Sequence, residues 1–214
     1  MYLKHDKASM NFQRRMLSLM GLLLPVLAPL LGFIAYDRNA PDFWWSISAT
    51  FYATSNWLMI GTLAIFSFFL WTYKGYDIGD DFTTKLSSIT ALLILVFPCK
   101  TSATGPTTGI LDLPTNISHV IHCIDALMLF GSFAYMIGCR FTKTGAIELT
   151  DGKKRRNTVY RICATVIVSA MLSQAATSIL GIGWMTIVNE AIMLWAFSFA
   201  WAVKSGMWRT KFGD

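Results

Sequence analysis

Four ionisable side chains occur inside apolar stretches of this sequence, where such groups are rare. His119, His122 and Asp125 are spaced three residues apart in the run 113–139, and Glu190 lies in a second run near the C-terminus. A bilayer core solvates ionisable groups poorly, so they usually face a protein partner or a water-filled cavity. We therefore expect these four side chains to form a polar site within a membrane-embedded bundle.

The four residue types allow two kinds of chemistry. Two imidazoles and two carboxylates could hold Zn²⁺ and activate a bound water molecule for hydrolysis. In that case His119 and His122 bind the metal or act as general base, Asp125 orients a histidine, and Glu190 is a ligand or acid. Without a metal, the same groups could bind a cationic or hydroxylated head group or relay protons. Both alternatives stay open at this stage.

The composition predicts that these residues lie in an integral membrane protein. Of 214 residues, 54% are hydrophobic and only 14% are charged, whereas about a quarter of the residues of soluble domains are charged. A helix of about 20 apolar residues crosses a hydrocarbon core of roughly 30 Å. We expect an all-α bundle of six transmembrane helices, forming one domain over residues 1–214, at residues 16–36, 45–73, 86–99, 117–139, 160–180 and 184–203.

The distribution of basic residues predicts the orientation. Lys and Arg gather in the N-terminal segment, the second and fourth loops and the C-terminal segment, whereas only Arg38 and Lys100 fall on the other side. The positive-inside rule then places both termini in the cytoplasm and the chain in the cell membrane. The same rule accounts for the net charge of +6, so we do not expect nucleic-acid binding.

The expected depth of the ionisable residues places them in the outer half of the bundle. If the fourth helix begins near Thr115, a rise of 1.5 Å per residue puts His119, His122 and Asp125 about 6, 10 and 15 Å below the interface. Other polar residues at similar depth could contact a head group: Ser46, Ser48, Tyr52, Asn56, Lys100 and Gln174. Four tryptophans flank this region: Trp44, Trp45, Trp57 and Trp184.

A purely structural interpretation explains part of this pattern. Ser and Thr in membrane helices often donate to their own backbone carbonyls, and a histidine–carboxylate hydrogen bond can simply hold two helices together. The hydroxyls of the second run are therefore better explained by packing than by ligand binding.

Several motifs carry a resemblance to known families. "SISATFY", "YKGYD", the helix with His119 and His122, and "NEAIMLWAFSFAWAVKSG" together resemble an uncharacterised bacterial family of small six-helix membrane proteins, which implies the fold but no activity. A thinner resemblance is to the ceramidase-like superfamily of intramembrane hydrolases, whose Ser-x-x-x-His motif is similar to Ser118 to His122. That superfamily completes a zinc site with a later Asp and a His-x-x-x-His pair. This chain lacks the later pair, so Asp125 or Glu190 would have to substitute.

Two function classes follow from the sequence. The first is a protein with a pocket in the extracytoplasmic leaflet that binds, and in the enzymatic version hydrolyses, a lipid or other amphiphile. The alternative is a small transporter, channel or membrane sensor or effector that binds a solute or proton. A structural or effector membrane protein without a ligand also stays open. The inner halves of the helices contain few polar residues, namely Ser67, Ser87, Ser88 and Ser198, which disfavours a pore through one subunit. Membrane lipids, a small-molecule ligand and further copies of the chain, in a homo-oligomer, are the expected partners.

Overall fold

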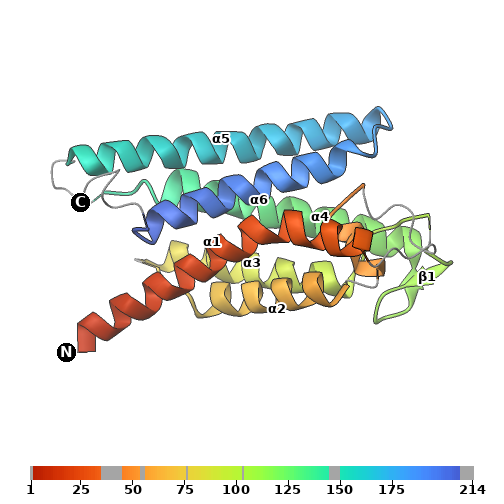
Figure 1. The fold of residues 1–214 in the computed structure, drawn as a ribbon, viewed down its shortest axis with the longest axis horizontal. Coiled ribbons are helices and arrows are strands. Elements are labelled where there is room, and N and C mark those ends of the chain that lie inside the picture. The colour runs from red at the N-terminus through yellow and green to blue at the C-terminus, as the bar shows by residue number, and fades with distance from the viewer. Residues whose placement is uncertain are drawn as a thin grey trace.

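The structure is a computed structural model that describes residues 2–34, 45–53, 56–75, 77–102, 104–144 and 150–207, with side chains from residue 8 onward. Six α-helices run alternately up and down one elongated bundle (Figure 1). Their bounds are α1 Tyr2–Ile34, α2 Asn56–Thr72, α3 Ile78–Val96, α4 Thr115–Tyr135, α5 Asp151–Ile179 and α6 Met185–Lys204. The predicted all-helical class is confirmed.

Short elements complete the two ends of the bundle. A 3-10 helix, η2 (Ser48–Tyr52), precedes α2, and a π-helical turn, η3 (Met136–Arg140), continues α4. Strands β1 (Thr107–Thr108) and β2 (Leu113–Pro114) pair antiparallel in a small hairpin between α3 and α4. We name the end that carries this hairpin the hairpin end. The opposite end, where α1 begins and α6 ends, is the basic end (Figure 1).

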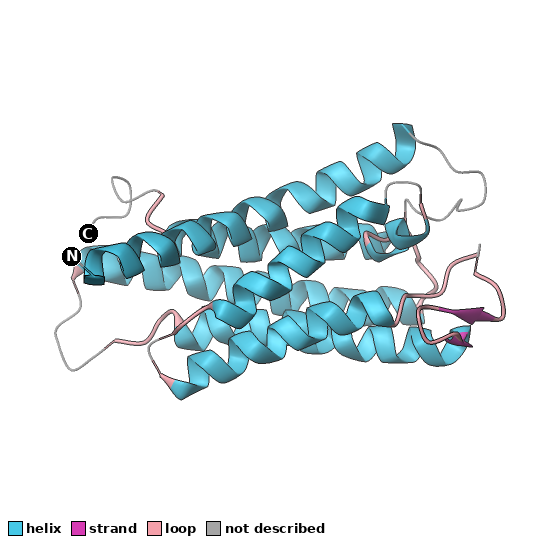
Figure 2. Ribbon diagram, turned by 90° about the horizontal axis from the view of Figure 1, so that it is seen from below, coloured by secondary structure: helices cyan, strands magenta, loops and turns pink. Residues whose placement is uncertain are grey.

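The helices form a closed ring. Each helix packs against its neighbours in sequence, and α6 closes the ring by packing against α1. The two perpendicular side views show the helices lying lengthwise along the bundle (Figures 1 and 2). At the α1–α6 contact, a Cβ on Gly21 would lie 2.5 Å from Ser198 Oγ. Close approach of the two helices therefore requires glycine there. Ser18 Oγ also donates to the Ser198 carbonyl over 2.8 Å.

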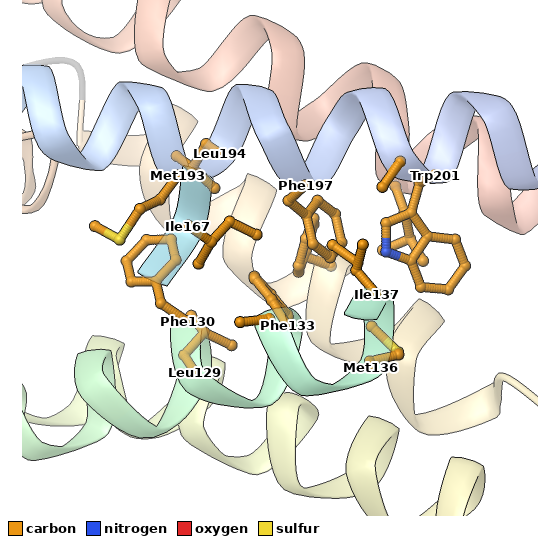
Figure 3. Close-up of a cluster of buried hydrophobic side chains, with 14 of the residues drawn as sticks. Leu129, Phe130, Phe133, Met136, Ile137, Ile167, Met193, Leu194, Phe197 and Trp201 are labelled. Atoms are coloured by element: carbon orange, nitrogen blue, oxygen red, sulfur yellow. The ribbon is translucent and has the colours of Figure 1, made fainter. Parts of the chain in front are cut away.

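Aromatic side chains fill the centre of the ring in its basic half. The rings of Phe133 on α4 and Phe197 on α6 lie 4.1 Å apart, and Phe66 on α2 lies 5.1 Å from Phe197. Figure 3 shows this core from the side, with α4 and α6 facing each other and Trp201 at its edge. Each such pair contributes about 0.5–1.5 kcal/mol beyond the area it buries. The centre of the ring is thus packed at this level.

Four helices are long and apolar enough to cross a membrane: residues 8–34 of α1, α4 with η3, α5, and α6. α2 is apolar but has 17 residues, and the 19 residues of α3 include Asp80, Asp81 and Lys85. Large apolar side chains such as Phe68 and Leu172 are exposed on the outside of the bundle, where lipid would cover them. These findings support a membrane protein.

The second predicted helix, 45–73, begins later than expected. Its helical part starts at Asn56, and residues 48–52 form the 3-10 helix η2. The serine and threonine hydroxyls at the start of the run form local hydrogen bonds with the backbone. Thr50 Oγ1 donates to the Ile47 carbonyl, and Ser46 Oγ accepts from Ser48 N–H. Such local bonds compete with α-helix formation.

The third predicted helix, 86–99, begins eight residues earlier, at Ile78, and ends at Val96. Asp77 caps its start by accepting from the amides of Gly79 and Asp80 over 2.9 and 3.1 Å. Pro98 explains the early end, since a proline disfavours the helical conformation of the residue before it. Four helices correspond to the other predicted runs: α1 to 16–36, α4 with η3 to 117–139, α5 to 160–180 and α6 to 184–203. Both α1 and α5 begin well before the predicted residues. Residues 35 and 36 lie outside the described residues.

A buried ion pair joins α3 to η3 at the basic end. Arg140 Nε donates to Asp80 Oδ1 over 2.6 Å, and the same guanidinium also contacts the Asp77 carboxylate. Arg140 and Asp80 are 8% and 7% exposed, whereas Lys143, which bonds to Asp77 over 3.0 Å, is exposed. Removing one partner would leave the other charge buried and uncompensated. The buried pair therefore holds α3 and η3 together.

Replacing Arg140 by Met should lower the free energy of unfolding by about 3 to 5 kcal/mol, because Asp80 would be left buried without its counter-charge. The measurement is reversible unfolding in mixed detergent micelles. Lys143→Met is the matched control and should cost less than about 1 kcal/mol, as exposed pairs do. Equal losses in the two variants would contradict the assigned role of Arg140.

Candidate functional site

One face of α4 carries most of the polar residues that point into the bundle. Ser118, His122, Asp125 and Ser132 recur at intervals of three, four or seven residues, which places them on a single helical face. All four are buried. The interhelical partners of Ser118, His122 and Ser132 lie on α3 or in the two residues that follow it, Phe97 and Pro98.

These partners define a polar contact that we name the α3–α4 seam. Ser118 Oγ donates to the Pro98 carbonyl over 2.9 Å, and His122 Nδ1 donates to the Phe97 carbonyl over 2.9 Å. Ser132 Oγ lies 2.6 Å from Ser87 Oγ. The Arg140–Asp80 ion pair ends the seam at the basic end. His122 and Ser118 therefore hold the hairpin end of α3 against α4.

Asp125 is the exception in this seam. It is 4% exposed, and its Oδ2 atom has no hydrogen-bond partner among the described residues. The pairing of His122 with Phe97 and of Ser132 with Ser87 puts Asp125 at the level of Ile94, a buried apolar residue. A buried polar atom without a partner costs about 1–3 kcal/mol. Asp125 thus has the capacity to accept one more donor or a cation.

Glu190 on α6 has a different set of partners. Its carboxylate accepts from Ser46 Oγ over 2.9 and 3.0 Å, from Ile47 N–H over 2.5 Å and from Ser48 Oγ over 3.2 Å. We name residues 45–48 the strap. Ile187 N–H also donates to the Trp45 carbonyl over 2.8 Å. The strap is therefore fastened to the first turns of α6 by both backbone and side chain.

His119 belongs to a third group, which we name the Lys100 cluster: Lys100, Asn116, His119 and Cys123. Lys100 Nζ donates to Asn116 Oδ1 over 3.1 Å, and Lys100 N–H donates to His119 Nδ1 over 3.2 Å. Cys123 Sγ lies 3.8 and 3.9 Å from the two ring nitrogens. Because His119 Nδ1 already accepts a hydrogen bond, its lone pair is not available to take the thiol proton. The pair is not arranged as a nucleophile and base.

Tyr52 and Cys99 connect these groups at the hairpin end. Tyr52 Oη donates to the Cys99 carbonyl over 2.8 Å and lies 2.9 Å from Thr108 Oγ1 in β1. Burial raises the pKa of Tyr52, so its hydroxyl is a donor at neutral pH. Burial also raises the pKa of Cys99 to about 12, and the negative charge of Glu190 adds to this effect. Glu190 therefore lies near the loop that leaves α3.

The two remaining predicted contact residues lie apart from these groups. Gln174 joins α5 to α6, since its Nε2 donates to Thr186 Oγ1 over 3.0 Å and its Oε1 accepts from Asn189 Nδ2 over 3.1 Å. Asn56 is half-buried at the first position of α2. Trp44 lies outside the described residues.

The predicted site residues thus fall into separate groups. Ser46 and Ser48 meet Glu190, Lys100 meets His119, and His122 and Asp125 lie in the seam. Among the residues that the structure describes, no three His, Cys, Asp or Glu side chains gather as metal ligands. This arrangement does not fit a zinc centre.

The ion pairs at the basic end involve residues that are not among the predicted site residues. The sequence predicts Arg140 only as one of the basic residues that set the orientation, and it places Asp77 and Asp80 in the loop between the second and third helices. A signal was present, since acids before the run 86–99 and a base after the run 117–139 meet when the two helices are antiparallel.

No family model, curated protein or solved structure matches this chain. The two family resemblances therefore stay predictions.

Replacing Glu190 by Ala should release the strap. Hydrogen bonds to a charged acceptor are worth about 1.5–3 kcal/mol, so the amide of Ile47 should exchange with deuterium roughly tenfold faster or more. Hydrogen exchange followed by mass spectrometry measures this rate. Thr186→Val, which removes a Gln174 contact one turn away and leaves Glu190 intact, should not change it. Unaltered exchange in the Glu190 variant would show that Glu190 does not hold the strap against α6.

Proposed function

We propose that this protein is a multi-pass membrane protein in which Asp125 binds a proton or a small cation. The observation that carries the proposal is the unpartnered Oδ2 of a 4% exposed carboxyl group in a seam whose other polar side chains have partners. Ionisable groups at membrane depth commonly mark ion or proton pathways. The proposal falls in the class of small transporters and sensors.

The position of Asp125 supports access from the hairpin end. It lies about 15 Å along α4 from Thr115, near the middle of a bilayer. Ser118 and His122 lie on the same face between Asp125 and that end, and both are bonded to carbonyls of the loop that follows α3. Movement of this loop would expose a row of polar groups leading to the carboxyl.

Hydroxyl pairs continue the polar groups toward the basic end. Ser87 bonds to Ser132, and Ser67 Oγ lies 2.8 Å from Ser88 Oγ between α2 and α3. The aromatic core fills the centre of the ring, so any path runs within the α3–α4 seam. A packed seam of this kind suits a proton or a dehydrated cation better than a hydrated solute.

The proposal includes six membrane-crossing helices with the basic end in the cytoplasm. The excess of Lys and Arg at that end supports this orientation. At the hairpin end, Trp45, Trp57 and Trp184 are exposed, as expected for aromatic residues at a membrane–water interface.

The Lys100 cluster favours a second candidate function, the binding of an amphiphile. A lysine, an amide and an imidazole are exposed or half-exposed side by side at the hairpin end, where they would meet lipid head groups. A head-group phosphate or hydroxyl could bind Lys100 and Asn116 while the tail lies along α4. The arrangement supports binding and offers no activated nucleophile for hydrolysis.

Replacing Asp125 by Asn should abolish ion movement in reconstituted liposomes, because an amide cannot exchange a proton or neutralise a cation. Proton, Na⁺ and K⁺ gradients with fluorescent indicators distinguish the ions. Wild-type protein should give flux of at least one of them, and the variant should match protein-free liposomes.

Asp112→Asn is the control for the Asp125 variant, since Asp112 is exposed and its left-handed backbone (φ 49°) tolerates asparagine. This variant should keep wild-type flux. If wild-type protein moves none of the three ions, thermal unfolding should still show cation-dependent stabilisation that Asp125→Asn removes, as a sensor requires. Flux or stabilisation that survives in Asp125→Asn would refute the proposal.

The amphiphile candidate predicts lipid retention at the hairpin end. Lys100→Gln should lose lipid molecules that native mass spectrometry detects on the wild-type protein, because the charge that holds the head group is gone. Lys154→Gln removes an exposed lysine at the opposite end and should retain them. Identical lipid binding in the two variants would rule out the Lys100 cluster as the site.

A further inference from the structure

The basic end contains a second polar cluster, around the aromatic side chains of Tyr73, Phe141 and Trp201. The ring of Trp201 lies 5.2 Å from Tyr73 and 5.1 Å from Phe141. Arg14 on α1 lies over Tyr73, with 5.5 Å between Cζ and the ring centroid, and Lys204 Nζ lies 4.7 Å from the Phe141 centroid. Two cations from the two ends of the chain therefore flank one aromatic group.

Two buried donors in this cluster have no acceptor. Arg14 is 7% exposed; its Nη2 donates to Tyr73 Oη over 3.1 Å and its Nη1 to Asn11 Oδ1 over 3.2 Å, but its Nε has no partner among the described residues. The indole Nε1 of the fully buried Trp201 also lacks one there. Buried donors are usually satisfied. Both donors belong to residues that contact Tyr73, so together they indicate a missing acceptor.

Basic side chains gather around these donors. Arg14, Lys153 and Arg156 lie close enough to Lys204 to repel its ammonium group, and Asp80 attracts it. Asp80 is already bound by Arg140. Lys153 Nζ donates to the Phe141 carbonyl over 2.8 Å, which keeps it beside the cluster. An additional anion would offset this repulsion.

We propose that the basic end binds a phosphate-type anion between α1 and α6, with Arg14, Trp201 and Lys204 as its ligands. Guanidinium groups bind phosphate oxygens through paired N–H donors, and the Nε edge of Arg14 offers such a donor. The indole N–H supplies a second neutral donor and Lys204 a point charge. In the structure the cluster is closed. Binding requires Arg14 to exchange its contact with the half-buried Asn11 on its own helix for the ligand.

The chemistry of the ligand is that of a phosphate monoester or diester. Two sources share it: the head group of an anionic lipid in the adjacent leaflet, and free phosphate from the aqueous phase. The last turn of α6 and the level of Arg14 on α1 lie at the end of the bundle, which both sources reach. This site is independent of Asp125, which lies in the hairpin half of α4.

Thermal unfolding of the full-length protein tests the proposal with defined probes. One arm adds inorganic phosphate to protein in a neutral detergent, with sodium chloride at equal ionic strength as the reference. The other compares nanodiscs of phosphatidylcholine with nanodiscs that also contain phosphatidylglycerol. A ligand at saturation should raise the unfolding midpoint by roughly 5 °C. A rise with phosphate identifies a soluble anion as sufficient, and a rise with phosphatidylglycerol alone identifies the lipid head group.

Arg14→Gln should abolish this rise, whereas Arg155→Gln, which removes an exposed charge at the same end, should keep it. If Arg14→Gln does not fold, Trp201→Phe decides the question, because it removes the indole N–H but keeps an aromatic ring and should reduce the rise. No rise with either probe overturns the proposal. A rise of equal size in the Arg14 and Arg155 variants also overturns it, since that result reports general charge screening.

Discussion

The hydrogen-bonded pairing of α3 with α4 sets the geometry on which both ends of the bundle depend. Two loop carbonyls, a pair of serines and a buried ion pair lie along one antiparallel register, from Ser118 at the hairpin end to Arg140 at the basic end. Apolar packing in lipid is weakly directional, so polar contacts of this kind specify which faces of two helices meet. A slip of α4 by one turn would separate the serines and leave Asp80 without Arg140. The same register fixes the level of Asp125 opposite Ile94, and so creates the unpartnered carboxyl oxygen.

Irregular segments supply most of the partners at the hairpin end. The amide of Ile47 and the serines beside it bond to Glu190, and the carbonyls of Phe97 and Pro98 bond to α4. Helix ends leave backbone groups unsatisfied, and here side chains of neighbouring helices satisfy them. A carboxylate that accepts several hydrogen bonds, as Glu190 does, therefore has a structural role as well as a possible chemical one. This explains why Glu190 and Asp125, which look alike in the sequence, have opposite environments in the structure.

Much of the fold was predictable from the sequence, whereas the site was predictable only in part. The all-helical class followed from apolar runs, because the requirement to satisfy backbone groups in lipid leaves few alternatives. The start of α2 did not follow, since the local bonds of Ser46 and Thr50 are joined there by hydrogen bonds to Glu190, a residue distant in sequence. The spacing of His122 and Asp125 predicted that they share one face of α4, where both are buried, whereas their depth in a membrane stays a prediction. The spacing could not give their partners, because these are loop atoms whose position depends on Pro98 and the hairpin.

In the described part of the chain, the two ends of the bundle differ in which kind of hydrogen-bonding group is left without a partner. Among the residues that the structure describes, the hairpin half contains an acceptor without a donor, at Asp125, and the basic end contains donors without an acceptor, at Arg14 and Trp201. Between them lies the aromatic core of Phe133 and Phe197, which separates the two groups and is too closely packed to deform gradually. The α3–α4 seam runs beside this core. Ser132 and Ser87 lie in the seam, and the ion pair of Arg140 with Asp80 ends it. Asp80 also attracts Lys204. Within the described ranges, the polar contacts of the two halves are therefore continuous only along α3 and α4, and one register of these helices sets the level of both Asp125 and Asp80.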